Sequence, residues 1–421
     1  MALNKVDGTA IDIEGLASSI KAKMSQDLFV SPNCSIFRAP TILLRLNEKA
    51  YVPDAFSIGP FHHGHPKLQA MEAIKSNYLQ GLISRSPFPE EMLRNMIMSI
   101  SDVEREVREC YAKPLNYSPD EFVKILVVDG CFIIELFRKD ADEKLRGVDD
   151  PIFNMSSMHQ FLYHDLILLE NQIPWMLLER LFNLTKDPTH DKPLTLIELA
   201  REFFADFFLT KPASGYPPIQ GMKHILDVFR KLLVSSTEKE KIGKIYWTLL
   251  PSATSLVEAG VKIKRREPKG ILDIKFADGV LEIPPLQIHE ITETFFRNLI
   301  CFEQCYPNCE PRFTSYAVLI DNLINNAKDV DVLIENKIIE NWLNPADAVP
   351  FFNQLYYNTH VKEIYYQGVR EEVNEYCNRR WPKWRAMLVR NYFNTPWAIL
   401  STTAATILLI LSFVQTWYTI Y

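Results

Sequence analysis

Glycine is scarce in this sequence, with 14 residues in a chain of 421, and cysteine is limited to seven. Few glycines together with long apolar stretches favour helices over turn-rich sheets. Seven cysteines are an odd number and too thinly spread for a disulfide scaffold, so the sequence predicts reduced thiols. Hydrophobic residues make up 47% and charged residues 23%, close to the globular average, which excludes a mostly disordered chain.

The familiar catalytic motifs are also missing. The chain contains no G-x-x-x-x-G-K-[ST] phosphate loop, no G-x-S-x-G nucleophile elbow, no G-x-G-x-x-G dinucleotide fingerprint and no H-E-x-x-H zinc motif. These absences make the corresponding enzyme classes poor expectations for this chain. They leave open an enzyme with an unrecognised pocket.

Nothing in the charge balance suggests a nucleic-acid partner. The net charge is −6, although the segment after Asn378 holds five basic residues and no acidic one. The rest of the chain is therefore mildly acidic, whereas binding nucleic acid without sequence preference needs a basic face. The five basic residues lie just before an apolar tail and indicate a membrane-flanking segment: Arg379, Arg380, Lys383, Arg385 and Arg390.

Charge is absent altogether from Asn391 to Tyr421. The stretch from Trp397 to Ile420 predicts a transmembrane helix, because a helix of that length spans roughly 36 Å and the hydrocarbon core is about 30 Å thick. Aromatic residues at both ends are typical of the membrane interface. The side chains expected to hold the anchor include Trp397, Leu400, Leu409, Phe413 and Trp417.

The flanking charge gives this anchor a direction. Basic residues on its N-terminal side predict, by the positive-inside rule, that the body lies in the cytosol. The first eight residues have no apolar core, so a signal peptide is not expected. The interpretation is a single-pass, tail-anchored protein of the plasma membrane or an endomembrane, with the lipid bilayer as a partner.

Helical periodicity dominates the rest of the chain. The clearest helix start is Ser118-Pro119-Asp120-Glu121, with a capping serine, a proline in the first turn and a glutamate three residues after the serine. Residues 32–66 are punctuated by proline and are expected to be extended. Helices are expected at 10–24, 68–82, 89–111, 118–137, 156–171, 174–184, 194–208, 220–234 and 290–358, and from about 361 onward.

Alternation with period two appears in one region only. The runs 261–264, 271–276 and 280–283 alternate, and Ala277-Asp278-Gly279 predicts a hairpin turn between the last two. The predicted fold class is mainly α, a large helical domain with a small β-hairpin element near 261–284 and one C-terminal transmembrane helix. The expected organisation is an N-terminal helical extension (1–30), a globular domain (31–360), a polar helix with a basic stem (361–395) and the anchor (396–421).

A series of short motifs follows in order between residues 33 and 420. It includes Ile36-Phe37-Arg38-Ala39-Pro40, Ser57-Ile58-Gly59-Pro60-Phe61-His62-His63-Gly64, Val128-Asp129-Gly130-Cys131-Phe132 and Asp165-Leu166-Ile167-Leu168-Leu169-Glu170-Asn171-Gln172. The series resembles a plant family known as domain of unknown function 247, or uncharacterised protein family 0481. The resemblance implies a flowering-plant membrane protein of mostly helical fold and lends no catalytic residues. Some grass relatives act in pollen–stigma self-incompatibility, a role that resemblance alone does not assign to this chain.

His62-His63-Gly64-His65 is the first candidate for a metal site. Adjacent side chains in an extended segment point in opposite directions, so at most two of the three histidines converge easily. A metal needs three or four ligands. The alternative is a structural or partner-contacting loop.

Two further clusters invite a chemical interpretation. His164-Asp165, with His159 one turn earlier, is similar to the motif of helical HD-type phosphohydrolases, but a separation of five rotates the two histidines apart. The alternative is surface histidine beside a capping or salt-bridging aspartate. Cys301, Cys305 and Cys309 lie at helical spacing that Pro307 interrupts, and are expected to be buried structural thiols.

Asp129-Gly130 interrupts an apolar helix. Either Gly130 allows close helix packing while Asp129 bonds a neighbouring backbone or arginine, or the pair lines a ligand pocket. Glu170-Asn171-Gln172 before Pro174 predicts a helix end whose polar groups tie down a turn. The site candidates are therefore His62, His63, Asp129 and Glu170.

The leading hypothesis is a tail-anchored, non-catalytic protein whose body binds unidentified protein partners and needs no cofactor or metal. The alternatives are a membrane-bound hydrolase and a small-ligand sensor. Convergence of Asp129, Glu170 and a histidine around one cavity would favour the enzyme. The oligomeric state is left open.

Overall fold

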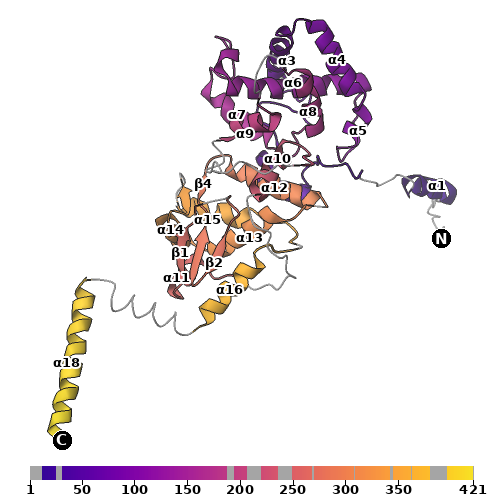
Figure 1. Cartoon of the computed structure of the whole chain (residues 1–421). Helices are drawn as coiled ribbons and strands as arrows, with labels where there is room; N and C mark the ends of the chain where they lie inside the picture. Colours follow the sequence, from indigo (N-terminus) through magenta and orange to yellow (C-terminus); the bar gives the residue numbers. More distant parts are fainter. Residues whose placement is uncertain are drawn as a thin grey trace, which may run out of the picture.

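The computed structural model describes residues 12–24, 31–186, 194–205, 220–235, 249–267, 270–307, 309–341, 345–361, 363–379 and 396–420. Figure 1 shows two stacked lobes, a violet and magenta N-terminal lobe and an orange C-terminal lobe, with helix α18 standing apart. The described residues are mainly helical and include two small sheets. The predicted fold class is confirmed, with one C-terminal helix that is long and apolar enough to span a membrane.

The N-terminal lobe is built around α6 (Pro119–Ala141), which is buried along most of its 23 residues. α7 (Ser156–Leu166) completes the lobe beside it. The helices that pack directly on α6 are α3 (Gln69–Ser84), α4 (Pro89–Ser101), α5 (Glu104–Arg108), α8 (Trp175–Leu184) and α9 (Leu196–Phe203).

The start of α6 follows its sequence signals. The Ser118 hydroxyl accepts a hydrogen bond from the Glu121 N–H, and the Glu121 carboxylate accepts one from the Ser118 N–H at 3.1 Å. Two otherwise unpaired donors of the first turn are thereby satisfied. The predicted capping box is confirmed.

α6 and α8 pack closely against each other at Gly130. A Cβ atom at this position would lie 2.5 Å from Leu181 Cδ1 and 3.0 Å from Leu177 Cδ2. A residue without a side chain is therefore required for the two helices to pack as they do. This geometry matches the packing interpretation of Asp129-Gly130.

The C-terminal lobe combines helices with a three-stranded sheet ordered β1 (Lys262–Arg265), β3 (Val280–Ile283), β2 (Lys275–Ala277). Strands β2 and β3 form the predicted hairpin, and its turn residues Asp278 and Gly279 have φ of 50° and 76°. Positive φ angles at both positions are typical of a two-residue hairpin turn whose central residues are left-handed. The lobe's helices are α10 (Ile225–Ser235), α11 (Ala253–Glu258), α12 (Thr292–Cys305), α13 (Arg312–Leu323), α14 (Ala327–Glu335), α15 (Pro345–Gln354) and α16 (Gln367–Asn378).

Several expected elements differ from those observed. The helix expected over 89–111 is broken between Ser101 and Glu104 into α4 and α5. The run expected to be helical over 290–358 also contains strand β5 (Ile339–Asn341), which pairs in parallel with β4 (Leu286–Ile288). The pairing of β1 with β3 is also parallel and was not expected.

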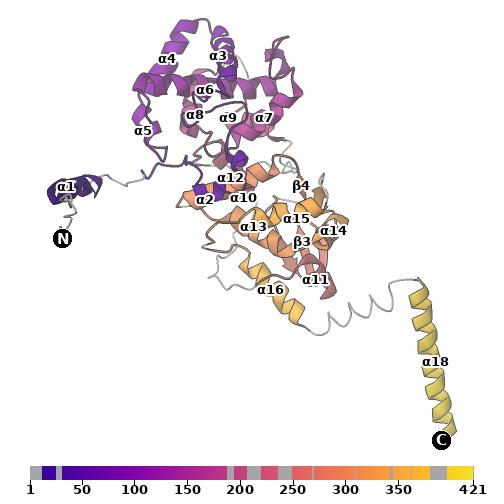
Figure 2. The same ribbon diagram turned by 180° about the vertical axis from the view of Figure 1, so that it is seen from behind.

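The N-terminal segment runs along the junction of the two lobes, where Figure 2 places α2 (Thr41–Leu44) beside α12. Asn298 on α12 donates to the carbonyl of Ala50, in the short helix η1 (Glu48–Tyr51), at 2.7 Å. The same side chain accepts from the Leu169 N–H at 2.9 Å. One amide therefore ties three distant parts of the chain together.

The packed body continues to Asn378. Val369, Val373 and Cys377 of α16 are buried, and its Tyr376 ring lies against Phe276 of β2 at 5.8 Å between centroids. The structure thus carries the body beyond the boundary expected at residue 360.

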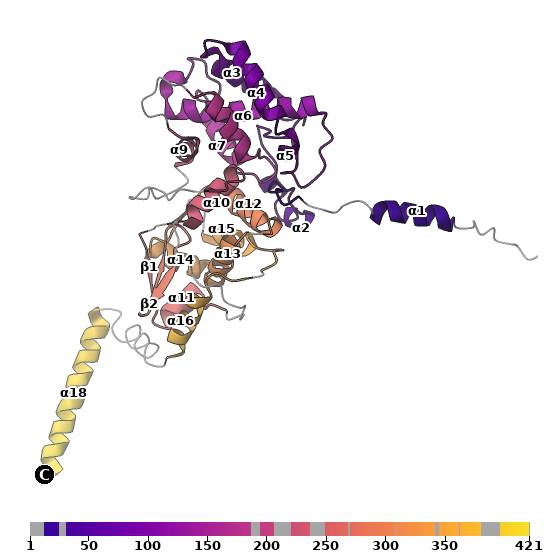
Figure 3. The same cartoon turned by 45° about the vertical axis from the view of Figure 1, so that its right-hand side comes forward.

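Helices α1 (Ile13–Met24) and α18 (Pro396–Ile420) leave the two lobes on different sides, as Figure 3 shows. None of the span Ile399–Thr419 is buried against the body. Of the expected basic stem only Arg379 is described, since Arg380, Lys383, Arg385 and Arg390 lie outside the described residues.

Candidate functional site

Buried polar residues of the N-terminal lobe gather around residues 38–62, which we call the clamped segment. This segment contains α2 and η1, but residues 52–62 lie outside helices and strands, and most of them are buried. Buried backbone N–H groups need partners, and outside regular structure side chains must supply them. The contacts below identify those partners.

Asp165, which follows His164 at the end of α7, holds the part of the clamped segment that follows η1. Its Oδ1 accepts from the Asp54 N–H at 2.8 Å, and its Oδ2 accepts from the N–H groups of Ala55 and Phe56 at 2.9 and 2.7 Å. The side chain is fully buried. Three charge-assisted hydrogen bonds therefore fix the chain as it leaves η1.

Asn171 and Asp129 hold the next residues. The Asn171 Oδ1 accepts from the Ile58 N–H at 2.7 Å, and its Nδ2 donates to the carbonyl of Phe56 at 2.9 Å. The Asp129 Oδ2 accepts from the Gly59 N–H at 2.8 Å.

Gly59 has a φ of +73°, and a Cβ there would lie 2.5 Å from the Gln172 carbonyl oxygen, so only glycine fits.

Lys75 of α3 neutralises Asp129 inside the lobe. Its Nζ lies 2.5 Å from Asp129 Oδ1, 2.7 Å from Glu72 Oε1 and 2.8 Å from the Ser57 carbonyl oxygen. Burial opposes the charged lysine, but the Asp129 and Glu72 carboxylates outweigh it and raise the pKa of Lys75. Asp129 is thus paired, and its Oδ2 is occupied by backbone.

Glu170 contacts both ends of the clamped segment. Its Oε1 accepts from the Ala39 N–H at 2.7 Å, and its Oε2 lies 3.2 Å from Arg38 Nη1 and 3.2 Å from His62 Nε2. Arg38 also donates to the Phe61 carbonyl at 2.9 Å and stacks over the Phe61 ring. Glu170 therefore contacts distant residues of the chain, whereas the sequence analysis expected it to tie down a turn at its own helix end.

His63 and His65 take no part in this cluster. The His63 ring packs edge-on against Tyr117 at 6.2 Å between centroids, and His65 is exposed. Only His62 of the three histidines contacts a carboxylate, so the His62-His63-Gly64-His65 run supplies at most one ligand to any site near Glu170.

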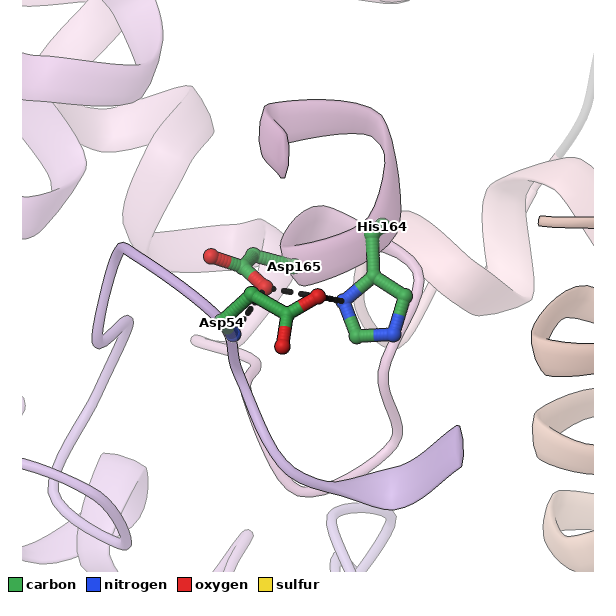
Figure 4. Close-up of side chains that lie close together, drawn as sticks. All are labelled: Asp54, His164 and Asp165. Atoms are coloured by element: carbon green, nitrogen blue, oxygen red, sulfur yellow. Dashed lines mark hydrogen bonds and ion pairs between the residues drawn. The ribbon is translucent and has the colours of Figure 1, made fainter. Parts of the chain in front are cut away.

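One group within the described residues could hold a metal ion: Asp54, His164 and Asp165, whose ligand atoms all lie within 4.8 Å of one another. Figure 4 shows the His164 Nδ1 facing both carboxylates, at 2.9 Å from Asp165 Oδ1 and 3.6 Å from Asp54 Oδ2. His159 is not part of this group and packs instead against the Phe153 ring at 5.0 Å. The two histidines therefore do not come together, in line with their separation of five residues on the helix.

The chemistry of this trio favours a structural role. Both Asp165 oxygens already accept backbone N–H groups, and Oδ1 also faces His164 Nδ1. The His164 Nδ1 can donate to Asp165 Oδ1, so this nitrogen already has a hydrogen-bond partner. A cation would have to displace that proton and compete with the backbone for Asp165, with Asp54 as an exposed third ligand. The arrangement of Asp54, His164 and Asp165 therefore suits the binding of the clamped segment better than the binding of a metal ion.

The cysteines form no metal-ligand cluster in the described parts of the chain. Cys301 and Cys305 lie on α12, which ends at Cys305, and Cys309 follows the helix. A hydrogen bond with Cys305 and burial raise the pKa of Cys301, and burial raises the pKa of Cys309. The same hydrogen bond from Cys301 lowers the pKa of Cys305. Reactive thiols need a lowered pKa, a shift that Cys301 and Cys309 do not have.

Asp129, Glu170 and a histidine do not form one site: within the described residues they make no group whose ligand atoms lie within 4.8 Å of one another. Each carboxylate instead serves a different part of the clamped segment. Sequence reasoning missed Lys75, although its signal was present. A lysine between Met71 and Tyr78 stands on the apolar stripe of α3, where a buried charge needs a partner.

The two lobes, the clamped segment and most of α18 fall within one family model, described as a plant protein of unknown function, which matches residues 36–411. The chain belongs to the DUF247 family. This DUF247 member is 29% identical over 412 residues to UPF0481 protein At3g47200 of Arabidopsis thaliana, covering 91% of this chain and 85% of that protein.

A second Arabidopsis thaliana relative, Putative UPF0481 protein At3g02645, is 21% identical over 494 residues, covering 94% of this chain and 92% of that protein. No solved structure matches this chain. The resemblance noted from the short motifs is therefore confirmed at the level of the family.

Proposed function

We propose that this DUF247 member is a single-pass, tail-anchored membrane protein whose two-lobed body binds protein partners at the membrane surface without catalysing a reaction. The evidence for a membrane anchor is the exposed apolar helix α18. Its span Ile399–Thr419 is 21 residues long and has no buried share. An exposed apolar helix of this length needs either a bilayer or another protein to cover it.

The energetics of α18 support insertion. Each leucine, isoleucine, valine or phenylalanine near the centre of a span favours insertion by about 0.3–0.6 kcal/mol, and no charge opposes it at about 3 kcal/mol. Trp397 and Trp417 stand near the two ends of the helix. The basic residues from Arg379 to Arg390 favour a cytosolic body, because cytoplasmic flanks are enriched in Lys and Arg.

The clamped segment supports a non-catalytic body. Asp129, Asp165 and Glu170 all accept backbone N–H groups, and Asp129 is also paired with a buried lysine. A general acid or base must reach a substrate proton, and a nucleophile must be exposed to its target. Carboxylates committed to the backbone meet neither requirement.

Proximity labelling tests the binding role. A biotin ligase fused to the N-terminus of the full chain is compared with the same ligase on residues 379–421 alone, at equal expression. We expect proteins labelled by the full chain and not by the anchor. A third sample carrying Asp165→Ala, which releases three backbone N–H groups in the body, should lose those proteins while keeping the membrane background. Identical labelling by all three samples would contradict the proposal that the body binds protein partners.

A further inference from the structure

Five lysine and arginine residues are buried among the described residues, and four of them contact a carboxylate. A buried cation is costly unless an anion compensates it, so such pairs are the usual arrangement. The four paired residues are Lys75, Arg230, Arg297 and Arg312. The fifth is Arg370 of α16, which has no carboxylate partner in the part of the chain that the structure describes.

The positive charge of Arg370 is therefore uncompensated inside the C-terminal lobe. Arg370 is 1% exposed, and its Nε and Nη2 atoms are buried without a hydrogen-bond partner among the described residues. Burial lowers the pKa of Arg370, and the Tyr356 phenol offsets this only in part. The Tyr356 hydroxyl itself donates to Asp321 Oδ2 at 2.9 Å. A water molecule can accept hydrogen bonds but carries no charge, so the environment of Arg370 calls for an anion.

The N-terminus of α16 is a second, independent feature that favours an anion. The helix has 12 residues, its N-cap Tyr366 makes no side-chain capping bond, and its first turn contains no acidic residue. By contrast α6, α9 and α14 each begin with a capping box that includes a carboxylate. The first N–H groups of a helix and its dipole place positive partial charge at this end, where oxyanions bind.

Arg370 reaches back over this end of α16. It is the fourth residue of the helix, and helical side chains lean toward the N-terminus. Gln367 stands three residues earlier and is 4% exposed. Residues three apart are neighbours on a helix surface, so the two side chains share one buried face. The guanidinium, the carboxamide and the start of the helix thus lie together.

Gln367 indicates which anion fits. Its Nε2 donates to Glu371 Oε1 at 2.8 Å, whereas its Oε1 is buried without a donor among the described residues. An acceptor at this position repels a fully ionised oxyanion but accepts from one that keeps a hydroxyl group. Inorganic phosphate keeps at least one O–H at neutral pH, whereas sulfate keeps none. The near-complete enclosure of both side chains also favours a small anion over a nucleotide.

We propose that the N-terminal end of α16 binds hydrogen phosphate, with Nε and Nη2 of Arg370 donating to its oxygens and Oε1 of Gln367 accepting from its hydroxyl. The N–H groups of the first helical turn are further donors. The bound anion compensates the charge of Arg370 and stabilises the C-terminal lobe. This ligand site belongs to the body and depends neither on the membrane anchor nor on a protein partner.

Thermal unfolding of the full chain in detergent micelles, followed by circular dichroism, tests the site. Phosphate and sulfate are titrated separately, with sodium chloride holding the ionic strength constant. We expect phosphate to raise the melting temperature, because a ligand that binds only the folded chain stabilises it. Sulfate should need a concentration about tenfold higher or more for the same rise, since it leaves the Gln367 acceptor unpaired. Gln367→Leu should remove this preference for phosphate.

Arg370→Met tests the cation. It should weaken phosphate binding about tenfold to a hundredfold, the range of one charge-assisted hydrogen bond. It should also raise the melting temperature in phosphate-free buffer, because it removes an uncompensated buried charge. The matched control is Arg297→Met, at a similarly buried arginine that is paired with Glu293 at 2.7 Å. That variant should melt at a lower temperature and keep the wild-type response to phosphate.

Three results would contradict the site. Phosphate that stabilises the wild-type chain no more than chloride does at equal ionic strength would overturn it. An unchanged phosphate response in Arg370→Met would place any bound anion elsewhere and overturn it as well. Should Arg370→Met fail to fold, Gln367→Leu remains decisive, because a wild-type preference for phosphate over sulfate in that variant would overturn the assignment of Gln367.

Discussion

At the scale of single residues, the N-terminal lobe depends on side chains that replace regular hydrogen bonding. The clamped segment has few backbone partners, so Asp129, Asp165, Glu170 and Asn171 accept its N–H groups. Loss of one buried acceptor leaves donors unpaired, which costs more than the bond itself contributed. Two predictions test this dependence, and a third concerns the buried His224.

The first concerns the buried ion pair. Lys75→Met leaves the Asp129 carboxylate buried without its cation, and we expect the free energy of unfolding to fall by about 3–5 kcal/mol. Lys75→Met combined with Asp129→Asn should recover part of the loss, because an amide oxygen still accepts from the Gly59 N–H. Urea unfolding of the full chain in detergent micelles, followed by near-ultraviolet circular dichroism, measures both. Lys67→Met, at an exposed lysine, is the control and should change little.

The second separates a clamp from a metal site at Asp54, His164 and Asp165. Asp165→Ala unpairs three backbone N–H groups and should lower the free energy of unfolding by about 4 kcal/mol. Asp54→Ala removes a potential ligand but none of those bonds, and should change it by less than about 0.5 kcal/mol. A chelator should leave the melting temperature unchanged. A chelator effect that Asp54→Ala abolishes would instead establish a metal site.

The third concerns pH. His224 is fully buried, and burial lowers its pKa to about 4. Its Nε2 lies 3.1 Å from the Ser35 carbonyl oxygen and its Nδ1 accepts from the Asp227 N–H at 3.3 Å, so only the neutral ring fits. The unfolded chain takes up a proton near pH 6.5, whereas the folded chain does not do so until about pH 4.

The direction in which stability changes with pH follows from this order of protonation. The stability associated with neutral His224 is fully present above pH 6.5 and declines as the pH falls toward 4, by about 3 kcal/mol in total. His224→Gln should be less stable than wild type at pH 7.5 but should show a shallower loss between pH 6.5 and 4. Parallel stability curves for the two proteins would contradict the assignment.

At the scale of elements, local signals were sufficient for some structures and insufficient for others. The α6 capping box and the β2–β3 hairpin lie within a few residues of sequence, and both were predicted. The β4–β5 pairing joins Leu286 to Ile339, a separation that no local pattern encodes. Likewise Asp129 was expected to bond a backbone, but its partner Gly59 lies 70 residues away and could not be inferred.

The close packing of α6 against α8 at Gly130 can be tested by substitution. Gly130→Ala would place a Cβ 2.5 Å from Leu181, and we expect a loss of about 1–3 kcal/mol as α6 and α8 separate. Gly81→Ala is the matched control on α3, where the nearest atom to a new Cβ is a Glu135 oxygen at 3.8 Å. That change should be neutral or stabilise by up to about 1 kcal/mol. Equal effects of both substitutions would argue against close packing at Gly130.

At the scale of the whole molecule, two lobes joined along the N-terminal segment form a body, and α18 stands outside it. Composition and periodicity predicted a large helical body and an apolar C-terminal helix. They could not predict that residues 35–50 lie at the lobe junction, because that placement depends on Asn298 and His224, far along the chain. They also set the end of the body too early relative to α16.

The central claim is that α18 holds this body on a membrane. Its most direct test is alkaline extraction of membranes from cells expressing the full chain or a chain ending at Asn378, which keeps the packed body through α16. The account predicts that the full chain stays in the membrane pellet while the shortened chain is released folded into the supernatant. Release of the full chain, or retention of the shortened one, would contradict it.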